Sequence, residues 1–580
     1  MKKLPTTGCK TACMLFVWMF LSASWLMAQQ PLSVIEGTIK DENGDPLTGA
    51  VVKVVNAPAR GTVSDVDGRY SIRADAGETL RFSYVGYEAK DVKVANSKRI
   101  DVVFDPSKQR ELQEIVVIGY GQVKKQDLTG SVVNVKMDDI KDIPVLSIDN
   151  ALQGRVSGMD VMSTTGEPGA STSIRIRGTR SITADNEPLI VVDGVMDAVQ
   201  SIADINAADI ADITILKDAS STAIYGSRGA NGVIIITTKR GENVSKPTIR
   251  FKSDVGFAQI PRYLDIMNAT EFAQYYNDYA YNSPNYRTDI TPTSPMSAYP
   301  FPDPYIYGEG TNWTKEITRI APYQDHSLSV SGGNNNTTYY ASAGYNNTQG
   351  IIKNSGVERY TLRFKIDYDL FKNVKIGYSR SYTNKDQDIN LAVIGGQQPW
   401  NAAIYLSPFL GVGDSYNAIY GNGQVINNPM HYIQLGTNNE VGISSADVGY
   451  IQIQAFRNME IRSQLSYSAY NSHGYRYESG QMPTKSMEEG GTAYRREYEI
   501  STLLSETTAT YKFQKGNRHF FDALVGITGS NWQYTNFTLQ GKGYLIDENT
   551  WNNMNAIADK ENYTASSTYE NKVKMSLLSR

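Results

Sequence analysis

The segment ERYTLRFKIDYDL, residues 358–370, alternates without a break between two kinds of side chain. Its apolar and aromatic row consists of Tyr360, Leu362, Phe364, Ile366, Tyr368 and Leu370. Its polar and charged row consists of Thr361, Arg363, Lys365, Asp367 and Asp369. Because successive side chains of a β-strand point to opposite faces, this pattern predicts a strand with one apolar face and one charged face.

The alternation continues after a very short turn. Lys372-Asn373 leads into a second alternating segment, residues 374–382, and residues 458–470 repeat the pattern. Strands of about ten residues with such faces, joined by short turns at one end and long loops at the other, are typical of an outer-membrane β-barrel wall. We expect long loops at 346–357 and from about 386 to 440. A soluble β-sandwich also alternates and is the alternative.

The composition excludes two classes of protein. The mean hydropathy of −0.38 argues against a helical membrane protein, whereas 38 Tyr and 48 Gly suit β-structure with one wet face. Lys and Arg number 56 against 60 Asp and Glu, for a net charge of −4. This balance gives no basic excess for binding nucleic acid.

The N-terminus predicts a signal peptide over residues 1–28. Lys2 and Lys3 precede an apolar run that ends at Ala28, where we expect cleavage. A membrane-spanning anchor is the alternative, although the run is short for a bilayer core of about 30 Å. Both cysteines, Cys9 and Cys13, lie in this segment, so the mature chain is expected to have no disulfide, thiolate metal site or cysteine nucleophile.

Motifs for catalysis are not found in the sequence. There is no GxxxxGK[ST] phosphate loop, no HExxH metal motif and no GxSxG nucleophile elbow. The four histidines are scattered through the predicted barrel: His326, His431, His473 and His519. We therefore expect no enzyme, no cofactor and no metal site.

The first mature module spans residues 33–105, where short strand signals alternate with turn residues. This spacing predicts a small antiparallel β-sandwich. Asp65 and Asp67 before Gly68 suggest a polar hairpin turn, because the rest of a calcium loop is missing. The module resembles the carboxypeptidase-regulatory-like domain at Gly37, Gly44-Asp45-Pro46, Gly49-Ala50, Gly61-Thr62, Asp65, Asp67-Gly68-Arg69-Tyr70 and residues 82–87.

The module at residues 126–241 predicts a compact α+β domain. We expect strands at 173–182, 187–195, 213–218 and 232–241, with a short non-strand segment at 219–232. The module is similar to the plug domain of TonB-dependent outer-membrane receptors at residues 216–221 and 225–234, with support from residues 175–178 and 192–194. We expect the block from Lys217 to Asn231 to be structural rather than to contact cargo.

The linker at 106–125 holds an apolar strand-former, EIVVIGYG, between polar flanks and with no evident partner strand nearby. Unpaired strands invite pairing with another chain, so this segment is suited to add as an extra strand to a partner's sheet edge. Its residues are Glu114, Ile115, Val116, Val117, Ile118, Gly119, Tyr120 and Gly121. The alternative is a closing strand of the preceding sandwich.

The order of sandwich, linker strand, plug and barrel (residues 247–580) looks like the SusC/RagA family of TonB-dependent receptors. The residues that carry this resemblance are 114–121, 124–125, 128–132, 339–342, 344–345, 350–353 and 359–363. The resemblance implies a mainly β fold with an internal plug in a barrel of 22 strands, and it identifies residues 114–121 as the TonB box. It also implies TonB-driven import of a large nutrient, commonly a glycan, through the outer membrane of a Gram-negative bacterium. A SusD-like lipoprotein would cover the mouth, and the N-terminal domain would lie in the periplasm.

One feature departs from that family. Residues 247–580 have room for only about eight to twelve strands of roughly ten residues, and the sequence ends within the strand-like KVKMSLLSR. We therefore expect this sequence to be the N-terminal part of a longer protein or a truncated product.

Alternative functions are a siderophore or cobalamin receptor without a lid, an oligopeptide importer, and a surface signalling or adhesion receptor.

No substrate-binding residue is assigned from the sequence. Five aromatic residues of the long loop could stack on sugar rings or pack within the loop: Trp400, Tyr405, Tyr416, Tyr420 and Tyr432.

Overall fold

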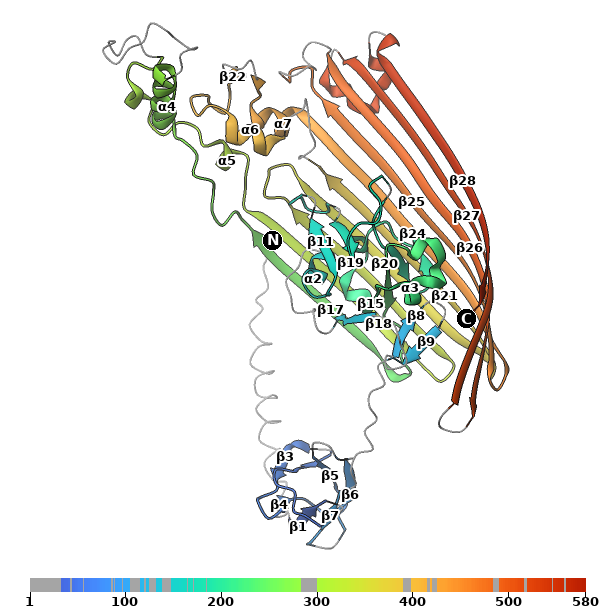
Figure 1. Cartoon of the computed structure of the whole chain (residues 1–580). Coiled ribbons are helices and arrows are strands. Elements are labelled where there is room, and N and C mark those ends of the chain that lie inside the picture. Colours follow the sequence, from blue (N-terminus) through green and yellow to red (C-terminus); the bar gives the residue numbers. More distant parts are fainter. Residues whose placement is uncertain are drawn as a thin grey trace, which may run out of the picture. The chain divides into compact units, whose positions relative to one another are not determined.

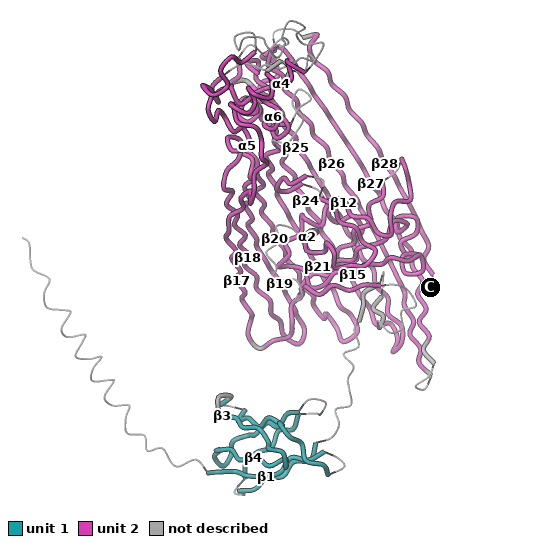
Figure 2. Tube along the Cα trace, turned by 60° about the vertical axis from the view of Figure 1, so that its left-hand side comes forward, with its two compact units in different colours: residues 1–114 teal, residues 115–580 magenta. Residues whose placement is uncertain are grey.

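The structure is a computed structural model, with its elements labelled in Figure 1. It describes residues 33–41, 44–55, 57–84, 87, 89–95, 98–104, 115–118, 121–124, 132–137, 148–163, 165–170, 172–183, 185–282, 300–389, 398–414, 418–419, 425–482, 490–515, 519–544, 546–557 and 560–579. The predicted signal peptide lies outside the described residues. The chain divides into two compact units, residues 1–114 and 115–580 (Figure 2).

The first unit is the predicted β-sandwich. One sheet has the order β4 (Arg69–Arg73), β1 (Val34–Lys40) and β7 (Val102–Val103). The second has the order β3 (Ala57–Val63), β2 (Val51–Val54), β5 (Thr79–Ser83) and β6 (Lys90–Lys93). Alternate residues of the strands are buried, and they form one core around Ile35, Ile39, Leu80, Phe82 and Phe104.

The turn between β3 and β4 has the polar form that the sequence predicts. The Asp65 carboxylate accepts hydrogen bonds from the backbone N–H groups of Asp67 and Arg69, at 3.0 and 2.7 Å. Gly68 completes the turn with a φ of 73°, a conformation that costs glycine little because it has no Cβ. The Asp65 side chain thus stabilises a hairpin turn.

The second unit begins with a two-stranded hairpin. Strand β8 (Ile115–Ile118) pairs antiparallel with β9 (Gly121–Lys124), with Val117 opposite Gln122. The linker segment therefore has an adjacent partner strand, contrary to the expectation from the sequence. The expectation failed because Gly121–Lys124 contains one apolar residue and gives little strand signal. Among the described residues, β8 pairs with no strand of the sandwich.

The predicted plug domain is built on a five-stranded sheet with the order β10-β15-β16-β13-β14. Its strands are β10 (Val132–Lys136), β15 (Ile210–Leu216), β16 (Val233–Thr238), β13 (Leu189–Val192) and β14 (Val195–Met196). Strands β11 (Met159–Ser163) and β12 (Thr172–Ile176) form a separate pair. The helical elements are α2 (Ile148–Leu152), η3 (Ile202–Asp204), η4 (Ala207–Asp209), α3 (Ala219–Thr222) and η5 (Ala223–Gly229).

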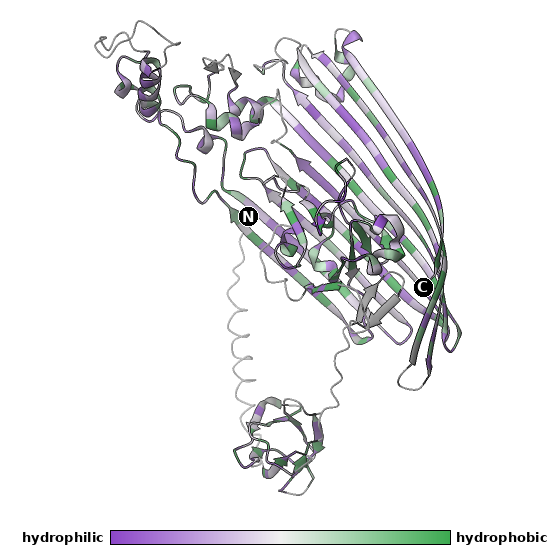
Figure 3. Cartoon of the chain, viewed as in Figure 1, coloured by the Kyte–Doolittle hydropathy of each residue, from purple (hydrophilic) through white to green (hydrophobic). Residues whose placement is uncertain are grey.

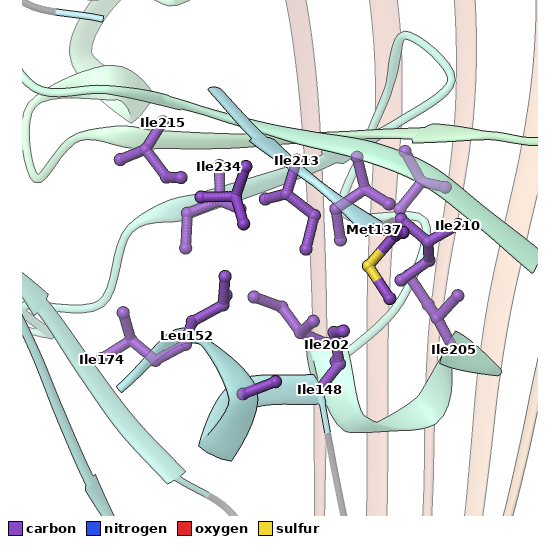
Figure 4. Close-up of a cluster of buried hydrophobic side chains, with 14 of the residues drawn as sticks. Met137, Ile148, Leu152, Ile174, Ile202, Ile205, Ile210, Ile213, Ile215 and Ile234 are labelled. Atoms are coloured by element: carbon purple, nitrogen blue, oxygen red, sulfur yellow. The ribbon is translucent and has the colours of Figure 1, made fainter. Parts of the chain in front are cut away.

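Branched aliphatic side chains fill the plug core between this sheet and α2. Figure 4 shows Ile213, Ile215 and Ile234 on the sheet side, facing Ile148 and Leu152 of the helix. All five are buried, at 3% exposure or less. A second buried cluster covers the other face of β16, which explains the continuous apolar run from Val233 to Ile236, since a strand covered on both faces needs no polar row.

Two predicted plug strands are shorter than expected. Residues 173–182 were expected to be one strand, but β12 ends at Ile176 because Arg177 and Gly178 both take positive φ angles, 58° and 86°. Residues 187–195 are interrupted by a two-residue turn at Asp193-Gly194, with φ angles of 49° and 89°. Asp-Gly favours such a hairpin turn because both central residues need positive φ.

The largest element is a ten-stranded antiparallel sheet, in the order of the chain. Its strands are β17 (Val244–Ala258), β18 (Ala321–Gly333), β19 (Thr337–Gln349), β20 (Gly356–Phe371), β21 (Val374–Asp388), β24 (Gly436–Phe456), β25 (Met459–Glu478), β26 (Gly491–Lys515), β27 (His519–Tyr544) and β28 (Tyr563–Ser579). The plug lies against one face of this sheet (Figure 1). We call this the inner face and the opposite one the outer face.

The two rows predicted at residues 358–370 fall on these two faces. Leu362 on the outer face is 55% exposed, whereas Lys365 on the inner face is 7% exposed. The Lys372-Asn373 turn joins β20 to β21 as predicted. Figure 3 shows that the strand ends beside α6 and α7 are largely hydrophilic. Among the described residues, no helix is both long and apolar enough to cross a membrane.

Long connections and short turns occupy opposite ends of the sheet. Among the described residues, the short turns are 334–336, 372–373 and 457–458. The loop predicted at 346–357 is only 350–355, because β19 and β20 extend into it by cross-strand pairing. The long connections carry α4 (Ala269–Asn282), η7 (Pro304–Tyr307), α5 (Trp313–Glu316), α6 (Pro399–Tyr405), β22 (Ala418–Ile419), β23 (Val425–Ile426), α7 (Pro429–Leu435), η8 (Asp547–Asn552), η9 (Met554–Ala556) and η10 (Lys560–Asn562).

Helices α5, α6 and α7 share a core of their own. Trp313, Tyr432 and Met482 are almost fully buried in it, and the Trp313 indole N–H donates to the carbonyl oxygen of Ser407 at 3.0 Å. Tyr432 thus packs within the loops and is not available to stack on a sugar, whereas Trp400 packs against this core and is only partly buried. Tyr405 is 64% exposed, and Tyr416 and Tyr420 lie outside the described residues.

Candidate functional site at the plug and the inner face

A buried carboxylate at the tip of the β13–β14 hairpin joins the plug to the sheet. Asp193 lies 3.1 Å from the Lys365 ammonium and 3.6 Å from the Arg363 guanidinium, both on β20. Thr238 of β16 donates to the same carboxylate from its backbone N–H, at 3.0 Å, and from its hydroxyl, at 2.5 Å. The side chains of Asp193, Arg363 and Lys365 are each at most 9% exposed.

Opposite charges decide the ionisation of Asp193. Burial by itself raises the pKa of a carboxyl group, but Lys365, Arg363 and the hydrogen bonds from Thr238 outweigh it and hold the pKa of Asp193 well below its usual range. The group is therefore ionised across the physiological pH range. Removing Asp193 would leave the charges of Arg363 and Lys365 buried without this partner, and removing both cations would leave the Asp193 carboxylate uncompensated.

Asp209 provides the second anion at this contact. Its carboxylate lies 3.8 Å from Arg363 Nε and accepts a hydrogen bond of 2.8 Å from the Tyr340 hydroxyl of β19. Asp209 itself sits in η4, which is capped by Asn206. The inner-face row of β20 thus meets carboxylates that two different plug elements present.

A second group of contacts lies around η3. Arg359 of β20 donates to the carbonyl oxygen of Ala203, and Thr383 of β21 donates to that of Asp204 at 3.2 Å. Gln387 of β21 reaches the carbonyl oxygen of Pro168 at 2.8 Å. These bonds give hydrogen-bond partners to three backbone carbonyl groups of the plug.

Asp149 of α2 is a buried carboxyl group inside the plug. It is 0% exposed, it accepts a hydrogen bond from the Thr172 hydroxyl, and its Oδ1 atom has no hydrogen-bond partner. Burial raises the pKa of Asp149 above the usual range, and the Thr172 bond offsets this only in part. Asp149 and Asp193 are thus two buried acids with opposite shifts.

A cavity of about 440 Å³ separates another part of the plug from the inner face. The lining residues of the plug include Asp185, Glu187, Asp197 and Arg228, and those of strands β24 to β27 include Tyr470 and Trp532. This cavity divides the block from Lys217 to Asn231. Lys217 donates to the carbonyl oxygen of Ser157 at 2.9 Å and is structural, whereas Arg228 and Asn231 line the cavity.

The predicted TonB box residues are only partly described. Ile115, Val116, Val117 and Ile118 form β8, and Gly121 begins β9. Glu114, Gly119 and Tyr120 lie outside the described residues.

Among all the residues that the structure describes, no group of three or more His, Cys, Asp or Glu side chains could hold a metal ion.

Comparisons with known proteins agree with this architecture. Residues 124–233 match the TonB-dependent receptor plug domain, and residues 35–117 match the CarboxypepD_reg-like domain. TonB-dependent receptor P26 of Formosa agariphila is 37% identical over 504 residues, which are 85% of this chain and 49% of that protein. TonB-dependent receptor SusC of Bacteroides thetaiotaomicron is 36% identical over 383 residues, 65% of this chain and 36% of that one.

A solved structure shows the same fold. The RagAB peptide importer in the open-open state matches with a TM-score of 0.68 and 25% identity, covering 80% of this chain and 54% of the other. The chain spans about half, or less, of the length of the curated relatives it matches. A plug domain held on the inner face of an antiparallel sheet, together with these matches, defines a TonB-dependent receptor. Within that class, the two matched domains and the likeness to SusC and to RagA are consistent with the SusC/RagA type.

Proposed function

We propose that the protein imports a large nutrient, an oligosaccharide or other glycan, through the outer membrane of a Gram-negative bacterium with energy from TonB. The observation that carries this proposal is the plug fixed to the inner face by buried charges at Asp193 and Asp209. A sheet with an apolar outer face suits lipid, and a domain held on its inner face would close the passage. Moving the plug out of the passage would require work, which TonB would supply.

The proposed route of that work is the linker between the sandwich and the plug. We assign residues 114–121 as the TonB box, with the sandwich (33–105) in the periplasm, the plug at 126–241 and the barrel from 247 onwards. An extended segment can add to a sheet edge of TonB through its main-chain N–H and C=O groups. Strand β8 is extended and lies in the two-stranded sheet with β9, so its other edge pairs with no described strand.

Deleting residues 114–121 tests this role. We expect the deletion strain to lose growth on the cargo while the receptor stays in the outer membrane at its normal level. A matched control deletes residues 106–113, eight mostly polar linker positions, and should keep uptake because it shortens the linker equally. Normal growth of the strain without 114–121 would refute the role of the box.

We also propose a SusD-like lipoprotein lid at the end of the sheet that carries the long connections. The support is the likeness to SusC and to RagA within the RagAB importer. Purifying the native receptor from outer membranes in mild detergent should bring down one surface lipoprotein in a fixed ratio. A receptor that purifies alone under these conditions would speak against the lid.

Oligopeptide import is the second candidate, because the matched RagAB structure is that of a peptide importer. Uptake of radiolabelled peptide and glycan mixtures by the same cells distinguishes the two. Glycan import predicts saturable uptake of saccharides alone.

A further inference from the structure

Helix α4 and the neighbouring η7 carry exposed aromatic and aliphatic side chains at the end of the sheet with the long connections (Figure 1). Tyr275 and Tyr279 are 50% and 46% exposed, and their spacing of four residues places them one turn apart on the same face of α4. Tyr305 and Ile306 of η7 are 75% and 71% exposed. We call these four residues the tyrosine platform.

Ring contacts connect the two parts of the tyrosine platform. The Tyr276 ring lies 5.9 Å from that of Tyr275 and 6.4 Å from that of Tyr279, between centroids. The Phe301 ring lies 6.2 Å from that of Tyr276 and 5.7 Å from that of Tyr307 in η7. The exposed rings therefore belong to one aromatic cluster. Large exposed apolar side chains that gather in one patch mark an interaction site, whereas scattered ones need no explanation.

Buried contacts hold the tyrosine platform in one conformation. Asn277, which is 8% exposed, donates to the carbonyl oxygen of Phe301 at 2.7 Å and accepts from the backbone N–H of Phe301 at 3.0 Å. The Phe301 ring packs on that of Phe409, at 4.9 Å between centroids. The backbone N–H of Ala269 donates to the carbonyl oxygen of Glu309 at 3.1 Å. A surface that is already ordered loses little conformational entropy when a partner binds.

The surroundings of the tyrosine platform are acidic. Residues 261–282 and 300–310 contain a single basic side chain, Arg262, which is exposed. The same residues contain these exposed carboxylates: Asp265, Glu271, Asp278, Asp303 and Glu309. Complementary charges around an interface attract the right partner, and like charges repel the wrong one. The partner that fits this surface is therefore apolar at its centre and basic around it.

We propose that the tyrosine platform docks a protein whose contacting surface has an apolar centre surrounded by Lys and Arg side chains. Tyrosine gives a large contact area with only two side-chain torsions to fix, and it is enriched in protein interfaces. A second copy of this chain would bring an equally acidic surface, and phosphate-bearing lipid headgroups are anionic too, so charge disfavours both. This inference goes beyond the proposed import, because it depends on neither the cargo nor TonB.

Photo-cross-linking of the full chain in living cells tests the docking. The photoreactive residue p-benzoylphenylalanine replaces Tyr305, and the adduct is digested with chymotrypsin and sequenced by mass spectrometry. We expect one protein adduct, joined through a peptide that contains Lys or Arg. The matched control carries the same group in place of Phe371, which is 64% exposed at the short-turn end of the sheet. It should give no such adduct.

Two double variants that carry the cross-linker at position 305 separate the apolar contribution from the electrostatic one. Tyr275→Ser with Tyr279→Ser should lower the adduct yield by about tenfold or more. Asp278→Lys with Glu309→Lys should lower the yield by about threefold or more, and added salt should lower the yield of the wild type. Glu242→Lys, at an exposed position just before β17, is the control and should leave the yield unchanged. Outer-membrane levels and thermal unfolding show whether each variant has kept its fold.

An adduct to a second copy, to another segment of the same chain or to lipopolysaccharide would overturn the inference. So would an adduct peptide without basic residues, an unchanged yield in Tyr275→Ser with Tyr279→Ser, or no adduct from a receptor at its normal level. A surface lipoprotein in the adduct would join the tyrosine platform to the proposed lid, and a different basic protein would support the platform alone. The assay adds no cargo and keeps residues 114–121, so its failure leaves the deletion test of import intact.

Discussion

At the scale of the residue, Asp193 makes the plug a fixed part of the receptor. It is held at positive φ in the tight Asp-Gly turn and faces two cations of β20. We expect Asp193→Asn to destabilise the plug by about 3–5 kcal/mol, because Arg363 and Lys365 keep their charges without this partner. Hydrogen exchange at the Thr238 amide, which donates to Asp193, should accelerate. Asp160→Asn, on the exposed side of β11, is the control and should change little.

The pH dependence of that effect has a defined sign. The pKa of Asp193 is lower in the folded state than in the unfolded chain, where it is about 3.9. The contribution of the Asp193 carboxylate to the free energy of unfolding is therefore complete above about pH 4, and it is lost as the pH falls through the pKa of the folded state. The wild type and the variant should differ fully at pH 7 and converge only in strong acid. Convergence between pH 7 and 5 would contradict this account.

Asp149 predicts the opposite behaviour. Its carboxylate is fully buried, one oxygen has no partner, and its pKa is raised by burial. Asp149→Asn removes a buried charge while an amide oxygen can still accept from Thr172. We expect equal or greater stability at neutral pH, by up to about 1 kcal/mol. The difference in stability between the variant and the wild type should narrow on acidification, since protonation of Asp149 removes the cost of burying its charge in the wild type. Urea unfolding of the wild type and the variant at pH 7 and pH 5 measures the difference in their free energy of unfolding at each pH. A clear loss of stability in the variant at pH 7 would refute this prediction.

At the scale of the element, the β8–β9 hairpin can be tested by its register. Val117 is opposite Gln122, so Val117→Cys with Gln122→Cys should form a disulfide in the mature chain. Mild oxidation and mass spectrometry detect the bond. The control pair, Val117→Cys with Val123→Cys, is shifted by one residue and places the thiols on opposite faces. Equal yields from the two pairs would mean that this register is wrong.

Strand length is also decided at this scale. Alternation correctly predicted β20 and the short turn at Lys372-Asn373, since the period of side chains needs no partner to be recognised. The ends of β19 and β20 were misjudged because cross-strand hydrogen bonds carry Asn346 and Thr348 into the sheet despite weak strand propensity.

At the scale of the whole molecule, the division into two units predicts independent folding of the sandwich. Its two sheets enclose their own core, including Phe82 and Phe104 at 0% exposure. A fragment of residues 33–104 should unfold cooperatively on heating, as followed by circular dichroism. Phe82→Ala should lower its free energy of unfolding by about 3–5 kcal/mol. Val66→Ala, at an exposed turn position, is the control. A fragment without a cooperative transition would show that the sandwich depends on the second unit.

The sequence by itself determined the class of fold and the two faces of the strands, because both follow from local periodicity and turn residues, and its resemblance to known domains indicated the order of the parts. It also contained the Asp193-Gly194 turn and the charged row of Arg363 and Lys365, more than 160 residues apart, without showing that they meet. Only the tertiary structure decided this contact, the β9 partner of β8 and the packing of Tyr470 against Tyr498. Such contacts depend on which strands become neighbours and on how the plug lies against them, and local pattern does not contain that information.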